Sequence, residues 1–152
     1  MKKLMLFMVA TAVSSLAFSQ KMQDKDIPGV VKTSLKKRYP AASSVKWDKE
    51  DGNYEASFEM NKHDGSALLD TKGNIIETEE EIAVAKLPSA VAPYVKAHYA
   101  GKKIEEASII TDAQGVVTYE AEIKGMDLLF NSKGEFLKEV KKDKESKEDE
   151  KD

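Results

Sequence analysis

One pattern of residues occurs twice in this chain, and the two occurrences are 60 positions apart. Pro28 is matched by Pro88, and the register persists as far as Tyr39 and Tyr99. A unit of this size buries little surface when it folds alone. The repeat therefore predicts two similar units that pack together, and it constrains the fold more than any other feature of the sequence.

Each copy begins with a predicted helix. Pro28 and Pro88 suit a first helical turn, where the N–H that proline lacks would have no partner. Apolar residues then recur at every fourth position and form one stripe along the helix. The stripe consists of Val31, Leu35 and Tyr39 in the first copy and of Val91, Val95 and Tyr99 in the second.

After each helix the spacing of apolar residues changes from four to two, which is typical of half-buried strands. A turn at residues 51–53 separates two alternating segments in the first copy, and a turn at residues 112–115 does so in the second. Each pair of segments predicts a β-hairpin with one buried and one solvated face. The expected buried residues are Val45, Trp47, Tyr54, Ala56, Phe58 and Met60 in the first copy and Ile109, Val117, Tyr119, Ala121 and Ile123 in the second.

A second hairpin closes each copy. Residues 67–77 match residues 128–138, and a Lys-Gly pair in each supplies the positive-φ residue that a tight turn requires. The first copy is about four residues longer between its two hairpins, at residues 61–65. Insertions fall on loops in most proteins, so we expect this segment to be a loop.

The chain is therefore predicted to be an α+β protein, a tandem repeat of a helix plus a four-stranded antiparallel meander. The first copy spans residues 27–82 and the second spans residues 87–140. We expect the helices to cover one face of a continuous eight-stranded sheet. The other face would then remain open to solvent.

The first 19 residues have the layout of a secretory signal peptide. Lys2 and Lys3 precede an apolar stretch, and small residues stand before Gln20, where we expect cleavage. The apolar run is shorter than the roughly 18 residues that span a bilayer. The mature chain is therefore expected in the periplasm or outside the cell, without insertion into a membrane.

The composition excludes several classes of protein. The chain has no cysteine, which excludes a disulfide, a thiol nucleophile and the lipid anchor of a bacterial lipoprotein. The formal net charge is −3 and the signs are interspersed, so we expect no nucleic-acid partner. Residues 141–152 hold eleven charges and no apolar side chain, which predicts a disordered charged tail.

The polar positions of the predicted hairpins would share the open sheet face. Aromatic residues such as Trp47 and Tyr119 alternate in phase with the aliphatic positions, so we expect them beneath the helices rather than in a ligand platform. An acidic face with a few apolar residues suits a partner protein or a basic peptide. The candidate binding residues on this face are Lys46, Glu55, Ser57, Glu59, Leu68, Glu120, Glu122, Lys124 and Leu129.

Catalytic and metal-binding motifs are weak in this sequence. His63 and His98 are the candidate proton-transfer groups, and neither accompanies a catalytic triad order, a His-Glu-x-x-His helix or a glycine-rich phosphate loop. The acidic run at residues 77–81 lacks the spacing and the glycine of a calcium loop, so we expect its charges to lie in water. The segment at residues 70–74 has a lysine among its would-be ligands. We expect no catalytic residue, no enzyme activity, no metal and no cofactor.

Several strand and turn motifs resemble those of a known family. They are Val45-Lys46-Trp47, Tyr54-Glu55-Ala56-Ser57-Phe58, Leu69-Asp70-Thr71-Lys72-Gly73-Asn74-Ile75-Ile76 and the Leu87-Pro88 pair that opens the second copy. Over residues 27–140 the chain resembles the PepSY-like proteins exported by Bacteroidota, which are described as similar to β-lactamase inhibitory protein. The resemblance implies a tandem helix-plus-four-strand fold, a periplasmic location and a non-catalytic role.

PepSY domains are associated with regulating or inhibiting peptidases, and the inhibitory protein binds its target on a concave sheet face. No target-contacting residue of that inhibitor is matched in this chain. Two functions remain open. The first is a protein-binding module, such as a peptidase or hydrolase inhibitor, that acts through the open sheet face and the loops at residues 61–65 and 112–115. The second is a carrier of a small apolar ligand or lipid, which requires a cavity of about 300 Å³ between helices and sheet.

Overall fold

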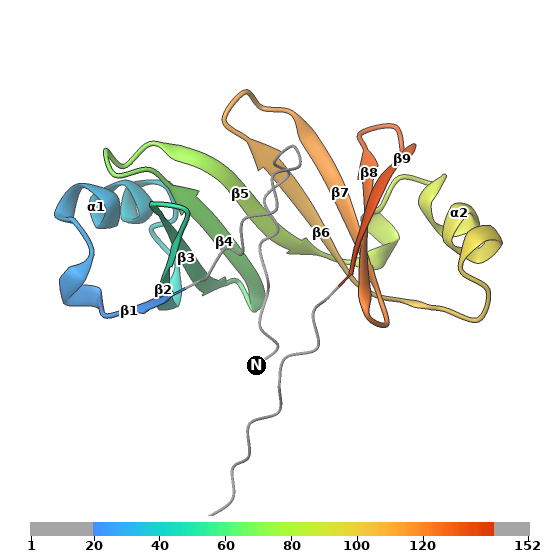
Figure 1. Ribbon diagram of the computed structural model, residues 1–152, viewed down its shortest axis with the longest axis horizontal. Coiled ribbons are helices and arrows are strands. Elements are labelled where there is room, and N and C mark those ends of the chain that lie inside the picture. Colours follow the sequence, from blue (N-terminus) through green and yellow to red (C-terminus); the bar gives the residue numbers. More distant parts are fainter. Residues whose placement is uncertain (1–19, 142–152) are drawn as a thin grey trace, which may run out of the picture. The chain divides into compact units, whose positions relative to one another are not determined.

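The computed structural model describes residues 20–141 (Figure 1). The expected signal peptide at residues 1–19 and the tail beyond Lys141 lie outside the described residues. The first copy contains β1 (Gln20–Met22), the short 3-10 helix η1 (Asp24–Asp26), α1 (Gly29–Arg38), β2 (Ser43–Glu50), β3 (Asn53–Met60), β4 (His63–Leu69) and β5 (Ile75–Ile82). The second copy contains η2 (Val84–Lys86), α2 (Val91–His98), β6 (Ile104–Asp112), β7 (Val117–Ile123), β8 (Met126–Asn131) and β9 (Phe136–Lys141).

The nine strands neighbour one another in chain order, from β1 to β9. This order confirms the predicted α+β fold, with two helices and the eight predicted strands. The additional strand is β1, in which Gln20 pairs with Lys49 and Met22 pairs with Trp47. The sequence did not predict β1, because three residues are too few to show an alternation of apolar and polar side chains.

The described chain divides into two compact units. One consists of residues 20–82 with residues 108–117, and the other consists of residues 83–107 with residues 118–141. Strand β6 therefore contributes its first part to the second unit and its last part to the first. Within the described residues, no helix is long and apolar enough to cross a membrane.

Helix α1 packs onto one face of β2 to β5 and forms the core of the first unit (Figure 1). Val31 is completely buried and Leu35 and Tyr39 are nearly so, which confirms the predicted helical stripe. The strands contribute Trp47 and Phe58 to the same cluster, as the alternation predicted. Burial of one such aliphatic side chain stabilises the fold by roughly 1.5–3 kcal/mol.

Helix α2 packs in the same way in the second unit. Val91 and Val95 are buried against apolar residues of β7 and β8. The ring of Tyr94 stacks on Phe136 of β9, with a centroid distance of 4.9 Å. The same ring lies edge-on to Phe130 of β8 at 5.6 Å. The aromatic contacts thus join the helix to the last two strands of its own copy.

A tyrosine at the end of each helix reaches a glutamate of the last strand in the same copy. The Tyr39 hydroxyl donates a hydrogen bond to Glu80 Oε1 at 3.2 Å, and the Tyr99 hydroxyl donates one to Glu139 Oε2 at 2.6 Å. The bond to Glu139, assisted by burial, raises the pKa of Tyr99 to about 12. Burial is the main cause of the raised pKa of Tyr39.

The prediction that Val45 is buried was wrong. Its side chain is 39% exposed, whereas Trp47 is buried as expected. Ser43 pairs with Glu59 and Lys46 pairs with Ser57, so β2 has one more residue than β3 between these two pairs. Such a β-bulge shifts the alternation, and Val45 leaves the core at that point.

The expected core residue of β6 was also wrong by one position. Ile110 is buried, with 3% exposure, while Ile109 is half-buried. Ala107 and Ser108 are buried in succession, so the strand does not keep a strict alternation. A single alternating pattern could therefore not locate the buried positions of this strand.

The expected loop at residues 61–65 is instead a two-residue turn. Asn61 and Lys62 have positive φ angles of 54° and 69°, as a type I′ turn requires. Met60 pairs with His63, so β4 has already begun there. The additional residues lengthen the hairpin of β3 and β4 rather than form a separate loop.

Three turns of the sheet share one design. The side chains of Asp70, Asp112 and Asn131 each accept hydrogen bonds from the backbone N–H groups two and four residues later. A glycine with positive φ follows three residues after each of them, at Gly73, Gly115 and Gly134. Two of these glycines belong to the Lys-Gly pairs, whose predicted positive φ is confirmed.

The turn at Gly73 is pressed against α1. A Cβ atom at this position would lie 2.8 Å from Ser34 Oγ and 3.0 Å from the Val30 carbonyl oxygen. Gly115 has a similar φ of 81°, and a Cβ atom there would meet nothing within 4 Å. A substitution at Gly115 would strain the backbone alone, whereas a substitution at Gly73 would both strain the backbone and clash with α1.

We expect Gly73→Ala to lower the free energy of unfolding by about 1–3 kcal/mol more than Gly115→Ala does. Both changes force alanine into the left-handed region, but the first also overpacks the contact with α1. Urea denaturation of the two variants measures the difference. Equal losses of stability would mean that the turn does not press on the helix.

Candidate functional site

The face of β2 to β5 opposite α1 carries rows of polar side chains, which we call the first polar face. Strand pairing sets three rows across the sheet. The first row contains Asp48, Glu55, Leu68 and Glu77, the second contains Lys46, Ser57, Ser66 and Glu79, and the third contains Glu59 and Asp64. None of these residues belongs to the core cluster beneath α1.

Strands β7 to β9 form a corresponding second polar face. Glu120 pairs with Leu129, which pairs with Lys138. Glu122 pairs with Asp127, and Lys124 follows β7 in the exposed turn. Pairing therefore brings Glu55, Ser57, Glu59 and Leu68 together with Lys46 in one unit, and it brings Glu120, Glu122 and Leu129 together near Lys124 in the other.

The prediction that these faces are fully open to solvent was wrong for four of the candidate residues. Glu55 and Glu120 are 8% and 6% exposed, Leu68 is completely buried, and Leu129 is 1% exposed. All four lie on inner strands of the sheet. Side chains of both neighbouring strands flank Glu55, Leu68 and Leu129 in their rows. The remaining candidates are exposed or half-exposed, and these are Lys46, Ser57, Glu59, Glu122 and Lys124.

The acidic run at residues 77–81 also differs from its prediction. Glu77 is 7% exposed and Glu79 is completely buried, although we expected their charges in water. The run forms most of β5, so alternate members point to opposite faces of the sheet. Glu77 and Glu79 therefore lie on the first polar face. Strand register, which the acidic run itself does not reveal, decides this placement.

Asp64, Ser66 and Asp127 are further members of the polar faces that the sequence analysis missed. Asp127 is 1% exposed and pairs with Glu122, so two carboxylates lie side by side on the second face. Ser66 is completely buried in the first face. Their alternation with Leu68 or Leu129 was a usable signal, because residues two positions apart in a strand share a face.

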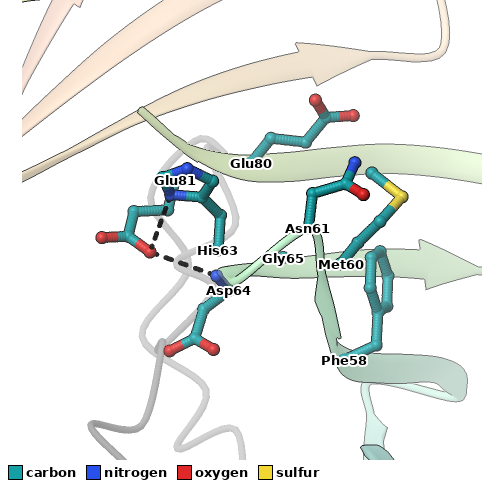
Figure 2. A pocket seen from close by; sticks show the side chains of 8 residues that line it. All are labelled: Phe58, Met60, Asn61, His63, Asp64, Gly65, Glu80 and Glu81. Carbon is teal, nitrogen blue, oxygen red and sulfur yellow. Dashed lines mark hydrogen bonds and ion pairs between the residues drawn. The ribbon is translucent and has the colours of Figure 1, made fainter. Parts of the chain in front are cut away.

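The tip of the β3–β4 hairpin contains a pocket of about 160 Å³. Its lining residues are Phe58, Met60, Asn61, His63, Asp64, Gly65, Glu80 and Glu81. Figure 2 shows Phe58, Met60 and Asn61 on one side of the pocket and His63 with Glu81 on the other. The Asp64 backbone N–H donates a hydrogen bond to Glu81 Oε2 at 3.1 Å, and His63 Nδ1 lies 3.7 Å from the same oxygen.

The two histidines lie far apart in the sequence and in different surroundings. His63 lines the pocket, whereas His98 is the last residue of α2 and stacks on Tyr94 at 4.0 Å. His98 Nδ1 also lies 2.9 Å from the Tyr94 carbonyl oxygen. In the part of the chain that the structure describes, no three His, Asp or Glu residues are arranged to hold a metal ion.

A protein-family model matches most of the chain. A family provisionally described as beta-lactamase-inhibitor-like and PepSY-like matches residues 17–77 and, in a second copy, residues 66–138. The two matches cover both copies of the repeat. No curated protein matches the chain at a significant level.

Solved structures of similar fold come from Bacteroides species. A protein of B. eggerthii, provisionally described as periplasmic, is 21% identical with a TM-score of 0.67, over 75% of this chain and 88% of that one. A protein of B. uniformis, from a family of unknown function, is 23% identical with a TM-score of 0.66 over the same shares. A BLIP-like protein of B. fragilis is 22% identical with a TM-score of 0.63, over 78% of this chain and 90% of that one. At these identities the similarity concerns the fold.

The carboxylates at the β2–β3 end of the first polar face repel one another. Glu50 is half-buried at the end of β2, and burial raises its pKa, with further contributions from the charges of Asp51 and Asp48. Its ionisation is therefore less favourable in the folded chain than in the unfolded chain.

We expect Glu50→Gln to raise the free energy of unfolding at pH 7 by up to about 0.5 kcal/mol, because solvent screens a half-exposed charge. The folded pKa lies above the unfolded value, so the wild type loses this contribution as the pH rises through the folded pKa. The gain of the variant should therefore vanish below the unfolded pKa. Urea denaturation at pH 7 and pH 3.5 tests this, with the exposed Glu105→Gln as a control. A gain that persists at pH 3.5 would contradict it.

Proposed function

Because the chain belongs to the PepSY-like, beta-lactamase-inhibitor-like family, we propose that it is an exported, non-catalytic module that binds a protein or peptide through its polar sheet faces. The observation that carries this proposal is the division of the strands into two kinds of face. Both helix-side cores are apolar, whereas the opposite faces concentrate carboxylates. Carboxylates held in rows by strand pairing favour a partner with basic side chains.

The partner that fits best is a hydrolase or peptidase whose activity the protein regulates. The family description and the BLIP-like protein of B. fragilis support this narrower proposal by analogy of fold. The half-exposed residues Ser57, Glu59 and Glu122, together with Lys46 and Lys124, are the proposed contacts. The other four candidates would pack among the contact residues without touching the partner, because little of their surface is accessible; they are Glu55, Leu68, Glu120 and Leu129.

Export is proposed from residues 1–19 and from the periplasmic description of the B. eggerthii protein. The proposed cleavage site before Gln20 coincides with the first residue of β1. Cleavage there would keep β1 intact, and its pairing with β2 would hold the new N-terminus at the edge of the sheet.

A carrier of a lipid or small apolar ligand receives less support. The pocket at the β3–β4 tip has about 160 Å³, which is smaller than the roughly 300 Å³ of ordinary ligand sites. Val31, Ala56 and Leu69, which lie between α1 and the sheet, are completely buried. Protein binding is therefore the proposal that we carry forward.

Charge reversal at half-exposed positions should weaken partner binding without unfolding the chain. We expect Glu59→Lys in the first copy or Glu122→Lys in the second to reduce partner capture at least tenfold. Each change replaces a carboxylate that attracts basic side chains of the partner by a cation that repels them. The measurement is affinity capture from a periplasmic extract of the source organism, with the full chain as bait and quantitative mass spectrometry as readout.

The control variant is Asp24→Lys combined with Glu135→Lys, which reverses two exposed acidic charges outside the polar faces. It should capture the partner as the wild type does. Equal capture by all variants, or no saturable partner for the wild type, would rule out the proposed binding mode.

A further inference from the structure

The two copies differ most in the hairpins β3–β4 and β7–β8. Tyr54 pairs with Leu69 in the first, and Tyr119 pairs with Phe130 at the same position in the second. Counting along the strands from these pairs, Phe58 and Gly65 in the first copy correspond to Ile123 and Met126 in the second. The first hairpin then continues for two more pairs, Glu59 with Asp64 and Met60 with His63.

This extension supplies most of the pocket. Met60, His63 and Asp64 line it and belong to the two pairs that the second copy lacks, and Asn61 lines it from the turn between them. The two copies also differ at Gly65, which lines the pocket. A Cβ atom there would lie 3.0 Å from Phe58 Cε2 and 3.3 Å from the Glu79 carbonyl oxygen, whereas the second copy has the long side chain of Met126 at this position. The Phe58 ring occupies the space that a side chain at position 65 would need, and the pocket lies beside it in the extended part of the hairpin.

The lining of the pocket combines apolar and acidic groups. The Phe58 ring and the Met60 side chain provide apolar contact, and Asp64, Glu80 and Glu81 provide carboxylates. No lysine or arginine is among its lining residues. A cation with a hydrocarbon stem can use both kinds of surface, because the stem contacts apolar side chains and the charged end donates hydrogen bonds to carboxylates.

Two of the carboxylates are already fixed in place. Glu80 Oε1 accepts a hydrogen bond from the Tyr39 hydroxyl at 3.2 Å, and Glu81 Oε2 accepts one from the Asp64 N–H at 3.1 Å (Figure 2 shows the second). A pre-ordered acceptor loses less side-chain entropy when it binds a donor. The volume of about 160 Å³ is too small for an ordinary ligand and suits a single side chain.

We propose that the pocket at the β3–β4 tip is an anchor site for one arginine side chain of the protein partner. This inference rests on the proposed protein-binding function and specifies what the partner presents. The guanidinium group would donate hydrogen bonds to Glu80, which shares the helix-side face with Met60, and the methylene stem would contact Met60. Glu81 points to the other face of β5, and its charge would add to the attraction. The second copy, in which the pocket-forming pairs are missing, would not share this site.

The test uses Nα-acetyl-arginine amide as the probe and the uncharged isostere Nα-acetyl-citrulline amide as its control. Amide chemical shifts of the ¹⁵N-labelled full chain are followed by nuclear magnetic resonance during titration. We expect saturable shifts centred on His63, Gly65 and Glu81 with the arginine probe, and binding at least tenfold weaker with the citrulline probe, because charge-assisted hydrogen bonds are lost.

Glu80→Gln combined with Glu81→Gln keeps the side-chain volumes and should weaken arginine binding about tenfold. Glu139→Gln is the matched control, because Glu139 bonds to Tyr99 as Glu80 bonds to Tyr39, and it should leave binding unchanged. A second variant replaces residues 59–64 by Lys-Gly, the turn of the second copy, and should abolish the shifts.

Absence of saturable shifts at the pocket, or equal binding of both probes, would overturn the arginine site. That result would leave the sheet-face proposal standing, since its test uses Glu59 and Glu122. Conversely, arginine binding that Glu80→Gln with Glu81→Gln weakens would support the site even if the face variants captured the partner normally.

Discussion

The packing of one helix against one face of each meander is the contact on which the remaining structure depends. Side chains of a strand alternate between faces, so a helix that buries every second residue also determines which residues lie opposite. Val31 of α1 and Val91 of α2 are completely buried against the strands of their own copies. The carboxylates of the polar faces consequently do not belong to the apolar cores, and this division supports the binding function that we propose.

Much of the fold could be predicted from the sequence because the repeat supplies the same evidence twice. The stripe through Leu35 and the alternation through Ala56 each recur 60–65 residues later, and both lie in the cores as predicted. Errors arose where a strand departs from regular alternation. The bulge beside Val45 and the two successive buried residues of β6 shift which positions of the strand point into the core. No residue type in the sequence marks either shift.

The sequence indicated which residues share each polar face better than it indicated how exposed their side chains are. The alternation predicted that these residues share a face, and strand register places Glu55 beside Leu68 and Glu120 beside Leu129. All four are nonetheless buried. Exposure depends on the neighbouring strands, which sequence spacing does not describe. The pocket was missed because the four additional residues suggested a loop, whereas they extend the β3–β4 hairpin by two pairs. Differences between the copies are thus more informative about function than their shared residues.

The most direct test of the central claim is to block one face at a time. The chain contains no cysteine, so Lys46→Cys on the first polar face and Lys36→Cys on the outer side of α1 each provide one exposed labelling site. Each variant is coupled to a bulky maleimide, and partner capture is measured before and after coupling. We expect the label at position 46 to reduce capture at least tenfold and the label at position 36 to leave it unchanged. Loss of capture from the helix label alone would contradict a binding role for the polar face.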